Sequence, residues 1–183
     1  LLIALELRSP SFRRGAFTDK TRARRNWPYI VSMLSTVILG SVVSQSISTV
    51  VPSILSLHTH FALDLLICFL VGEFINYALH YIQHANAYLW RFHFQHHIES
   101  EYNLWLAVQF NAIEIFVSSC LMAVVMSGLG FSPLARQIYF LFYITITTWH
   151  HSSSHYNIGW LGNIIVSPAL HKLHHSVHVR GNY

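Results

Sequence analysis

Long apolar runs separated by short polar segments make up most of this chain. The runs cover residues 28–51, 61–79, 104–127 and 134–149. A helix needs about 20 predominantly apolar residues to cross a bilayer core of about 30 Å. The pattern therefore predicts an all-α integral membrane protein with about four transmembrane helices, the first of them truncated or two of them forming a re-entrant pair.

Both ends of the chain are abrupt. The sequence opens on LLIALEL without an initiator methionine and ends on Gly181, Asn182 and Tyr183. We therefore expect residues 1–183 to form one membrane domain that is a fragment trimmed at both ends.

Composition supports the membrane assignment. Of the 183 residues, 53% are hydrophobic and 10% are charged, whereas a soluble domain carries about 25% charged residues. Seven of the eleven basic residues lie in the first 25 positions. Next to an apolar run, such a segment is more typical of a juxtamembrane anchor than of a nucleic-acid-binding tail, so no nucleic-acid partner is expected.

The basic segment also predicts the side of the membrane on which the later polar motifs lie. If that segment is cytoplasmic, successive crossings return residues 80–97, and everything from His150 onward, to the cytoplasmic face. We expect this face to belong to the endoplasmic reticulum in a eukaryote or to the inner membrane in a bacterium.

Histidine is the outlying residue type, with fourteen in the chain. Ten of them form a pair, a triplet, a second pair and a second triplet, with helical spacings that place each set on one face. In chain order these ten are His80, His84, His93, His96, His97, His151, His155, His171, His174 and His175. Ser167 and Pro168, just before the last triplet, predict a helix start with serine as the N-cap.

The number of these histidines indicates two metal ions. Imidazole is the commonest metal ligand, and ten imidazoles are too many for one ion. Two metals with about five nitrogens each, and an open position on each, account for them. This donor set suits iron, copper, nickel or zinc without choosing among them. A lone HxxxH pair would more often be structural, but the repetition on one membrane face favours metal binding.

Other polar residues have different expected roles. Tyr77 and Glu73 lie about one and two turns before His80, where a carboxylate is costly unless a ligand imidazole donates to it. His150 lies about 100° around the helix from His151, which favours a place behind the metal ligands. The remaining histidines, His58, His60 and His178, are expected in loops or at the surface.

In these motifs the chain resembles the fatty acid hydroxylase/sterol desaturase superfamily of membrane di-iron proteins. The resemblance rests on HYIQH (80–84), WRFHFQHH (90–97), HYN (155–157) and SPALHKLHH (167–175). The gap between the first two motifs is shorter than in the acyl-CoA desaturases. The likeness extends over nearly the whole chain and is strongest from Glu73 to His175.

The resemblance implies a helical membrane stem under a cytosolic cap that holds two iron ions, with zinc as a substitute and O₂ as co-substrate. The ten histidines would be the ligands, and Glu73, Tyr77, His150 and Asn157 would lie behind them. It also implies a lipid substrate from the bilayer and electrons from an external donor, such as cytochrome b5 or a ferredoxin with its reductase.

One segment departs from the family pattern. Many members carry R-x-H-P-x-E after the second histidine motif, whereas this chain has QFNAIE. Gln109, Asn111 and Ala112 replace arginine, histidine and proline, while Glu114 is kept. The departure leaves substrate and subclass open, although all ten ligand positions are filled.

The resulting hypothesis is an O₂-dependent di-iron oxidoreductase, a lipid hydroxylase or desaturase that acts on a C–H bond of a sterol, a fatty acyl chain or a related lipid. Two alternatives stay open: a non-catalytic membrane metal-binding or transport protein, and an inactive family member that serves as a scaffold. A transporter needs ionisable residues along a path through the membrane, and such residues are sparse in the apolar runs.

Overall fold

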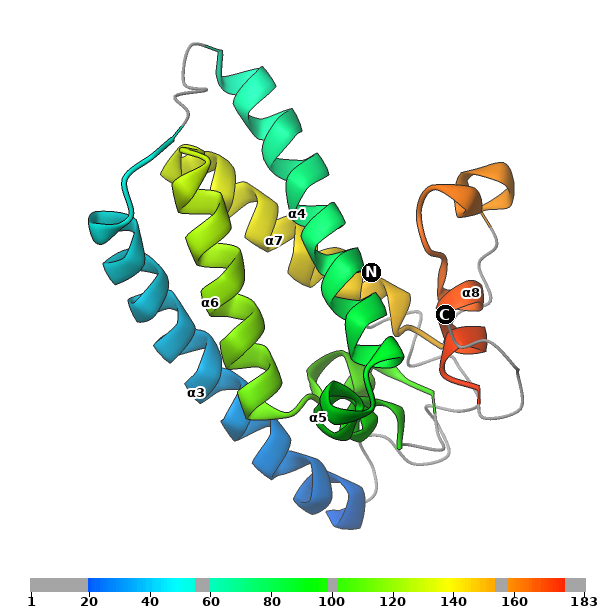
Figure 1. Ribbon diagram of the computed structural model, residues 1–183. Coiled ribbons are helices and arrows are strands. Elements are labelled where there is room, and N and C mark those ends of the chain that lie inside the picture. Colours follow the sequence, from blue (N-terminus) through cyan, green and yellow to red (C-terminus); the bar gives the residue numbers. More distant parts are fainter. Residues whose placement is uncertain (1–19, 55–59, 99–101, 154–157, 177–183) are drawn as a thin grey trace.

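The computed structural model describes residues 20–54, 60–98, 102–153 and 158–176 (Figure 1). All regular structure in these ranges is helical, as the apolar pattern predicts. The long helices are α3 (Lys20–Val50), α4 (Phe61–Ala85), α6 (Ala112–Gly128) and α7 (Pro133–His150). The short ones are α5 (Ala87–His97), α8 (Pro168–His174) and the 3₁₀ helices η1 (Leu104–Val108) and η2 (Gly159–Asn163).

The four long helices alternate in direction. Figure 1 shows α3 and α6 running one way, packed along each other, while α4 and α7 run the other way and cross. The C-terminal ends of α4 and α7 therefore lie at the same end of the bundle, together with α5 and α8. The described histidine motifs on α4, α5 and α8, and His150 and His151 at the end of α7, therefore lie toward one end of the bundle.

Two helix boundaries differ from the sequence prediction. α3 begins at Lys20 rather than at Pro28, which lies inside the helix, because the arginine and alanine residues before it are good helix formers. The run 104–127 is not one helix, since its first residues form η1 and α6 begins only at Ala112. Asn111 causes this start, because its side chain accepts a hydrogen bond from the Ile113 N–H at 2.9 Å as an N-cap.

Helix length and composition support one candidate membrane span among the described residues, α4, with 25 residues. The next apolar helix, α6, has 17 residues. At about 1.5 Å per residue it reaches about 25 Å, short of a bilayer core of about 30 Å. The arrangement of about four spans therefore stays a prediction.

An apolar core holds α4, α6 and α7 together at the end of the bundle away from the histidines. Its buried residues are Cys68, Met126, Phe131, Ala135 and Tyr139. Gly72 allows the Tyr139 ring to rest directly on α4, because a Cβ atom at this position would lie 2.2 Å from Tyr139 Cζ. This close contact fixes how α4 and α7 pack against each other, and so helps to position the ends of both helices that carry histidines.

Candidate metal centre

A single residue, Asn86, separates α4 from α5. It is the C-cap of α4 and the N-cap of α5, and its side chain accepts hydrogen bonds from the N–H groups of Tyr88 and Leu89 at 2.9 and 3.2 Å. This cap ends one helix and begins the next. The turn brings the first triplet back onto the first pair, as the short gap predicts, and the His80 and His93 ring centroids lie 4.8 Å apart.

The second triplet lies on α8, which begins where the sequence predicts. Ser167 is the N-cap, with its hydroxyl accepting from the Leu170 N–H at 3.3 Å, and Pro168 is the first helical residue. The predicted helix start is confirmed. α8 directs its histidines toward α4, α5 and the end of α7. The His174 ring centroid lies 4.7 Å from that of His80 and 4.8 Å from that of His97, and the His171 centroid lies 4.5 Å from that of His151.

Nine of the ten predicted ligands converge in two groups. The five-histidine cluster consists of His80, His84, His93, His97 and His174, and the four-histidine cluster of His96, His151, His171 and His175. In each cluster, one ring nitrogen from every member lies within 4.8 Å of the others. The tenth predicted ligand, His155, and the predicted neighbour Asn157 lie outside the described residues.

The two triplets divide between the clusters in opposite ways. His93 and His97 of α5 belong to the five-histidine cluster, while His96 between them belongs to the four-histidine cluster. In α8 the outer two histidines join the four-histidine cluster, and His174 joins the five-histidine cluster. The middle histidine diverges from the outer two because it lies about 60° to 100° away around the helix. Each cluster therefore needs both triplets in place.

Within the clusters, ring nitrogens approach one another closely. In the five-histidine cluster, Nε2 of His80 lies 2.8 Å from Nε2 of His174, and those of His93 and His97 are 3.2 Å apart. In the other cluster, successive Nε2 atoms are 3.1, 3.0 and 3.3 Å apart along the order His96, His151, His171, His175. Two nitrogens about 2.1 Å from one ion and at right angles would be about 3.0 Å apart, so this spacing fits a shared ion.

Burial keeps these rings neutral. Desolvation, and then the neighbouring imidazoles, lowers the pKa of His97 to about 2, and desolvation lowers the pKa of His151 to about 3. The pKa values of His96 and His171 are also well below the usual range, for the same main reason. Because a metal binds the neutral imidazole, the clusters are ready for it at physiological pH.

Two buried histidines are oriented by hydrogen bonds at Nδ1. His151 Nδ1 lies 2.7 Å from the backbone carbonyl oxygen of Thr147, and His93 Nδ1 lies 2.7 Å from Glu114 Oε1. In each case Nδ1–H is the donor, which leaves the lone pair on Nε2, the atom directed into the cluster. This is the arrangement usually found for metal-binding histidines.

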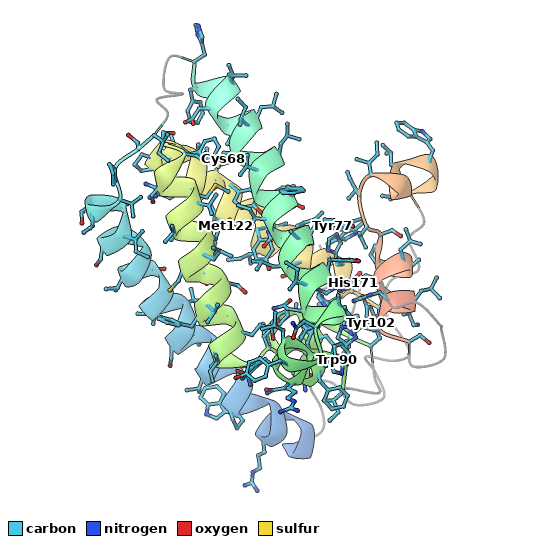
Figure 2. All side chains as sticks on the ribbon, viewed as in Figure 1. Cys68, Tyr77, Trp90, Tyr102, Met122 and His171 are labelled. Carbon is cyan, nitrogen blue, oxygen red and sulfur yellow. The ribbon has the colours of Figure 1, made fainter. Side chains whose placement is uncertain are left out.

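Aromatic side chains surround the two clusters. The Phe110 ring stacks on His96 at 4.1 Å between centroids, the Trp90 ring lies 5.0 Å from His84, and the Tyr102 ring lies 5.5 Å from that of His175. Figure 2 shows Trp90, Tyr102 and His171 gathered at the end of the bundle opposite Cys68. These rings shield the imidazoles from water on several sides.

Of the predicted neighbours of the metal site, Glu73 and Tyr77 interact with other side chains. Glu73 accepts a hydrogen bond from the Tyr139 hydroxyl at 3.1 Å, and that hydroxyl accepts from Asn76 Nδ2 at 2.6 Å. Tyr77 is 67% exposed, and its ring stacks on that of Tyr81. Their assignment as neighbours of the metal ligands stays a prediction.

His150 does lie beside a cluster, with its ring centroid 5.5 Å from that of His171. Desolvation lowers its pKa to about 4, and its backbone carbonyl accepts a hydrogen bond from the Tyr102 hydroxyl. His150 is thus a neighbour of the four-histidine cluster through His171, and its role behind the metal ligands stays a prediction.

Glu114 is a carboxylate that contacts a predicted ligand, His93, although it lies outside the histidine motifs. Its signal in the sequence is a lone acid in the first turn of an apolar helix, three residues after the Asn111 cap. The residues that depart from the family pattern also have structural roles. Asn111 caps α6 and donates to Gln95 Oε1 at 3.2 Å, and Gln109 is buried.

Two known proteins are similar in sequence to this chain. Ornithine lipid hydroxylase OlsE of Rhizobium tropici is 30% identical over 151 residues, which are 75% of this chain and 44% of that protein. Alkylglycerol monooxygenase of Homo sapiens is 27% identical over 107 residues, 58% of this chain and 24% of that protein. The chain thus spans less than half the length of either relative, and no solved structure matches it. Residues 65–183 match the fatty acid hydroxylase family model, and the chain belongs to the fatty acid hydroxylase family.

Proposed function

We propose that this chain is the catalytic domain of an O₂-dependent, di-iron lipid hydroxylase. The observation that supports this most directly is the pair of interleaved imidazole clusters at one end of the bundle. The two relatives are named as a hydroxylase of ornithine lipid and a monooxygenase of alkylglycerol, so hydroxylation of a polar lipid is favoured over desaturation.

The five-histidine and four-histidine clusters would each hold one iron, with His155 as a further ligand. Nitrogen-only donors suit iron and also zinc, but zinc has no redox chemistry. When bound, the irons would supply the reduction of O₂ that places one oxygen atom in a C–H bond and releases the other as water. That balance needs two electrons and two protons from outside the chain, and a protein donor such as cytochrome b5 or a ferredoxin would supply the electrons.

The side chains contribute position and exclusion of water. The hydrogen bonds at Nδ1 of His93 and His151 hold these rings with Nε2 directed into the clusters. The division of both triplets ties the spacing of the two ions to the packing of α5 against α8. Phe110, Trp90 and Tyr102 keep bulk water from the rings.

An apolar stripe on α4 supports a membrane location and a lipid substrate. Leu66, Leu70 and Phe74 recur every four residues and are 56%, 64% and 68% exposed. Such a surface suits lipid chains better than water, and it runs along the helix that ends in His80 and His84. The basic N-terminal segment supports a cytoplasmic position for the clusters.

The proposal can be tested on full-length protein purified in detergent and loaded with iron(II) without oxygen. We expect two irons per chain and O₂-dependent hydroxylation of lipid in the presence of a reductant. The variant His96→Ala/His174→Ala removes one ligand from each cluster and should lose both iron and activity. His60→Ala is the matched control, because His60 is exposed at the opposite end of α4 and its side chain makes no cap hydrogen bond.

Each other result points to a different function. Two irons without turnover by any reductant would favour an inactive scaffold. Zinc in both clusters of protein isolated from iron-supplied cells would favour a non-catalytic metal-binding protein. One metal or none would contradict the two-cluster interpretation.

A further inference from the structure

We propose that Glu114 is a positioning residue that strengthens metal binding at the five-histidine cluster through His93, and so makes the two metal positions unequal. This inference rests on the proposed metal binding. It concerns a carboxylate that the histidine motifs do not contain.

Glu114 is placed where three helices meet. It lies in the first turn of α6, and its Oε1 atom lies 2.7 Å from Nδ1 of His93 on α5 and 3.0 Å from Nε2 of Gln83 on α4. The side chains of His93 and Glu114 are 1% and 7% exposed. Because donors from two other helices converge on one oxygen, small movements of Glu114 would be transmitted to the His93 ring.

The hydrogen bond determines which nitrogen of His93 can bind metal. Nδ1–H donates to the carboxylate, so the lone pair is on Nε2, which lies 3.2 Å from Nε2 of His97 inside the cluster. A carboxylate behind a ligand imidazole also makes the ring a stronger base, and removing such a partner typically lowers metal affinity about 10- to 100-fold.

The surroundings of Glu114 favour a positive charge on the far side of His93. Its second oxygen, Oε2, is buried and has no hydrogen-bond partner among the residues that the structure describes. A buried carboxylate is unfavourable unless charge or hydrogen bonds compensate it. A divalent ion on Nε2 would supply that charge across the ring.

The four-histidine cluster has a different partner at the equivalent place. There, His151 Nδ1 lies 2.7 Å from the backbone carbonyl oxygen of Thr147, which is a neutral acceptor. One cluster is thus backed by a carboxylate and the other by a peptide group. We therefore expect the five-histidine cluster to hold its metal more tightly.

The test is stepwise release of iron(II) from the loaded protein to a competing chelator, without oxygen. Glu114→Gln keeps an oxygen near His93 but removes the charge. It should lower the iron affinity measured in one of the two release steps about 10- to 100-fold and leave the affinity measured in the other unchanged. Glu114→Asp keeps the charge and should recover part of the loss. Single variants assign the steps, because His174→Ala should remove the step that Glu114→Gln weakens and His171→Ala should remove the other.

Asp64→Asn is the matched control for loss of a buried carboxylate. Asp64 lies at the far end of α4, where its Oδ2 accepts from the Ser132 N–H at 3.2 Å, and asparagine retains such an acceptor. This variant should leave both release steps in place, even if it lowers the thermal stability of the protein.

Two results would overturn the inference. One is a wild type with two metals and a Glu114→Gln variant that releases both as the wild type does. The other is an equal loss of iron affinity in both release steps, together with lower stability of the metal-free protein. That result would make Glu114 a structural residue only. A wild type that binds no metal would overturn the proposed function as well.

Discussion

Near their N-terminal ends α4 and α7 pack together through apolar side chains, whereas their C-terminal ends carry histidines that belong to two different imidazole clusters. The apolar end contains Cys68, Phe131 and Ala135, and polar side chains at its edge make hydrogen bonds to other protein groups. The Arg136 guanidinium donates to the Ser127 hydroxyl at 2.7 Å, and the Ser132 N–H donates to Asp64. Asp64 Oδ1 and Arg136 Nε are buried without a hydrogen-bond partner among the described residues, so apolar packing is the main stabilising interaction at this end.

The histidine end is different because its buried polar atoms mainly face one another. Neighbouring Nε2 atoms lie about 3 Å apart. Each neutral ring has one N–H and one lone pair, and at His93 and His151 the N–H is used at Nδ1, so their Nε2 lone pairs face other ring nitrogens. Buried acceptors without donors are unfavourable. An ion at each cluster would engage these lone pairs at once, so one end folds by packing while the other is completed by metal.

Removal of metal should have the largest effect on stability, and that effect should be confined to the histidine end of the bundle. A ligand present at about 1,000 times its dissociation constant stabilises the folded state by about 4 kcal/mol, so chelation should lower stability by about that amount. Amide hydrogen exchange, measured by mass spectrometry, should become faster in α5 and α8. The amides of α4 around Gly72 and of α7 around Ala135 should stay protected. Equal loosening of both ends would contradict the comparison, and added iron(II) should reverse the change.

Gly72→Ala should destabilise mainly the apolar end of the bundle, opposite to the end affected by metal removal. The new methyl group would overlap the Tyr139 ring, and overpacking of this kind costs about 1 to 3 kcal/mol in unfolding free energy. Thermal unfolding in detergent measures the loss. Gly162→Ala is the control, because its Cβ would lie 3.5 Å from Leu170 Cδ1, an ordinary contact. Equal stability of the two variants would show that the close contact between α4 and α7 is not needed.

Ser167→Ala should have the smallest effect, confined to the histidine end. Loss of an N-cap costs about 1 kcal/mol, equivalent to about a fivefold change in a binding constant. Because α8 supplies histidines to both clusters, the metal affinity should fall in both release steps. In Glu114→Gln it should fall in only one. Ser167→Asp retains a capping oxygen and should restore wild-type release. A change in only one step would mean that α8 does not join the clusters as a unit.

Several local features follow from the sequence because they depend on neighbouring residues only. The first histidine pair lies on α4 and the first triplet on α5, as their spacing predicts, and Ser167 begins α8 as predicted. The second pair begins at His151, which is the C-cap of α7 rather than a residue inside a helix. The start of α6 could not be read in the same way. Hydropathy is nearly continuous through 104–127, and only the capping geometry of Asn111 shows where the helix begins.

Contacts between residues far apart in the chain are harder to predict from the sequence. The sequence predicts Glu73 as a carboxylate behind a ligand, since it shares a helix face with His80. In the structure Glu73 accepts from Tyr139, 66 residues away, and Glu114 reaches His93 across 21 residues. Spacing along one helix predicts which side chains share a face, but it does not predict which neighbouring helix that face meets.

From the sequence alone one can determine the helical class, the count of histidines sufficient for two ions, and their gathering at one end, because alternating helices return every motif to the same side. The tertiary structure alone decided how each triplet divides between the clusters and which carboxylate stands behind them. The physical reason is that the packing of Gly72 on Tyr139 and the turn at Asn86 set the angles between helices, and those angles choose the partners of each ring.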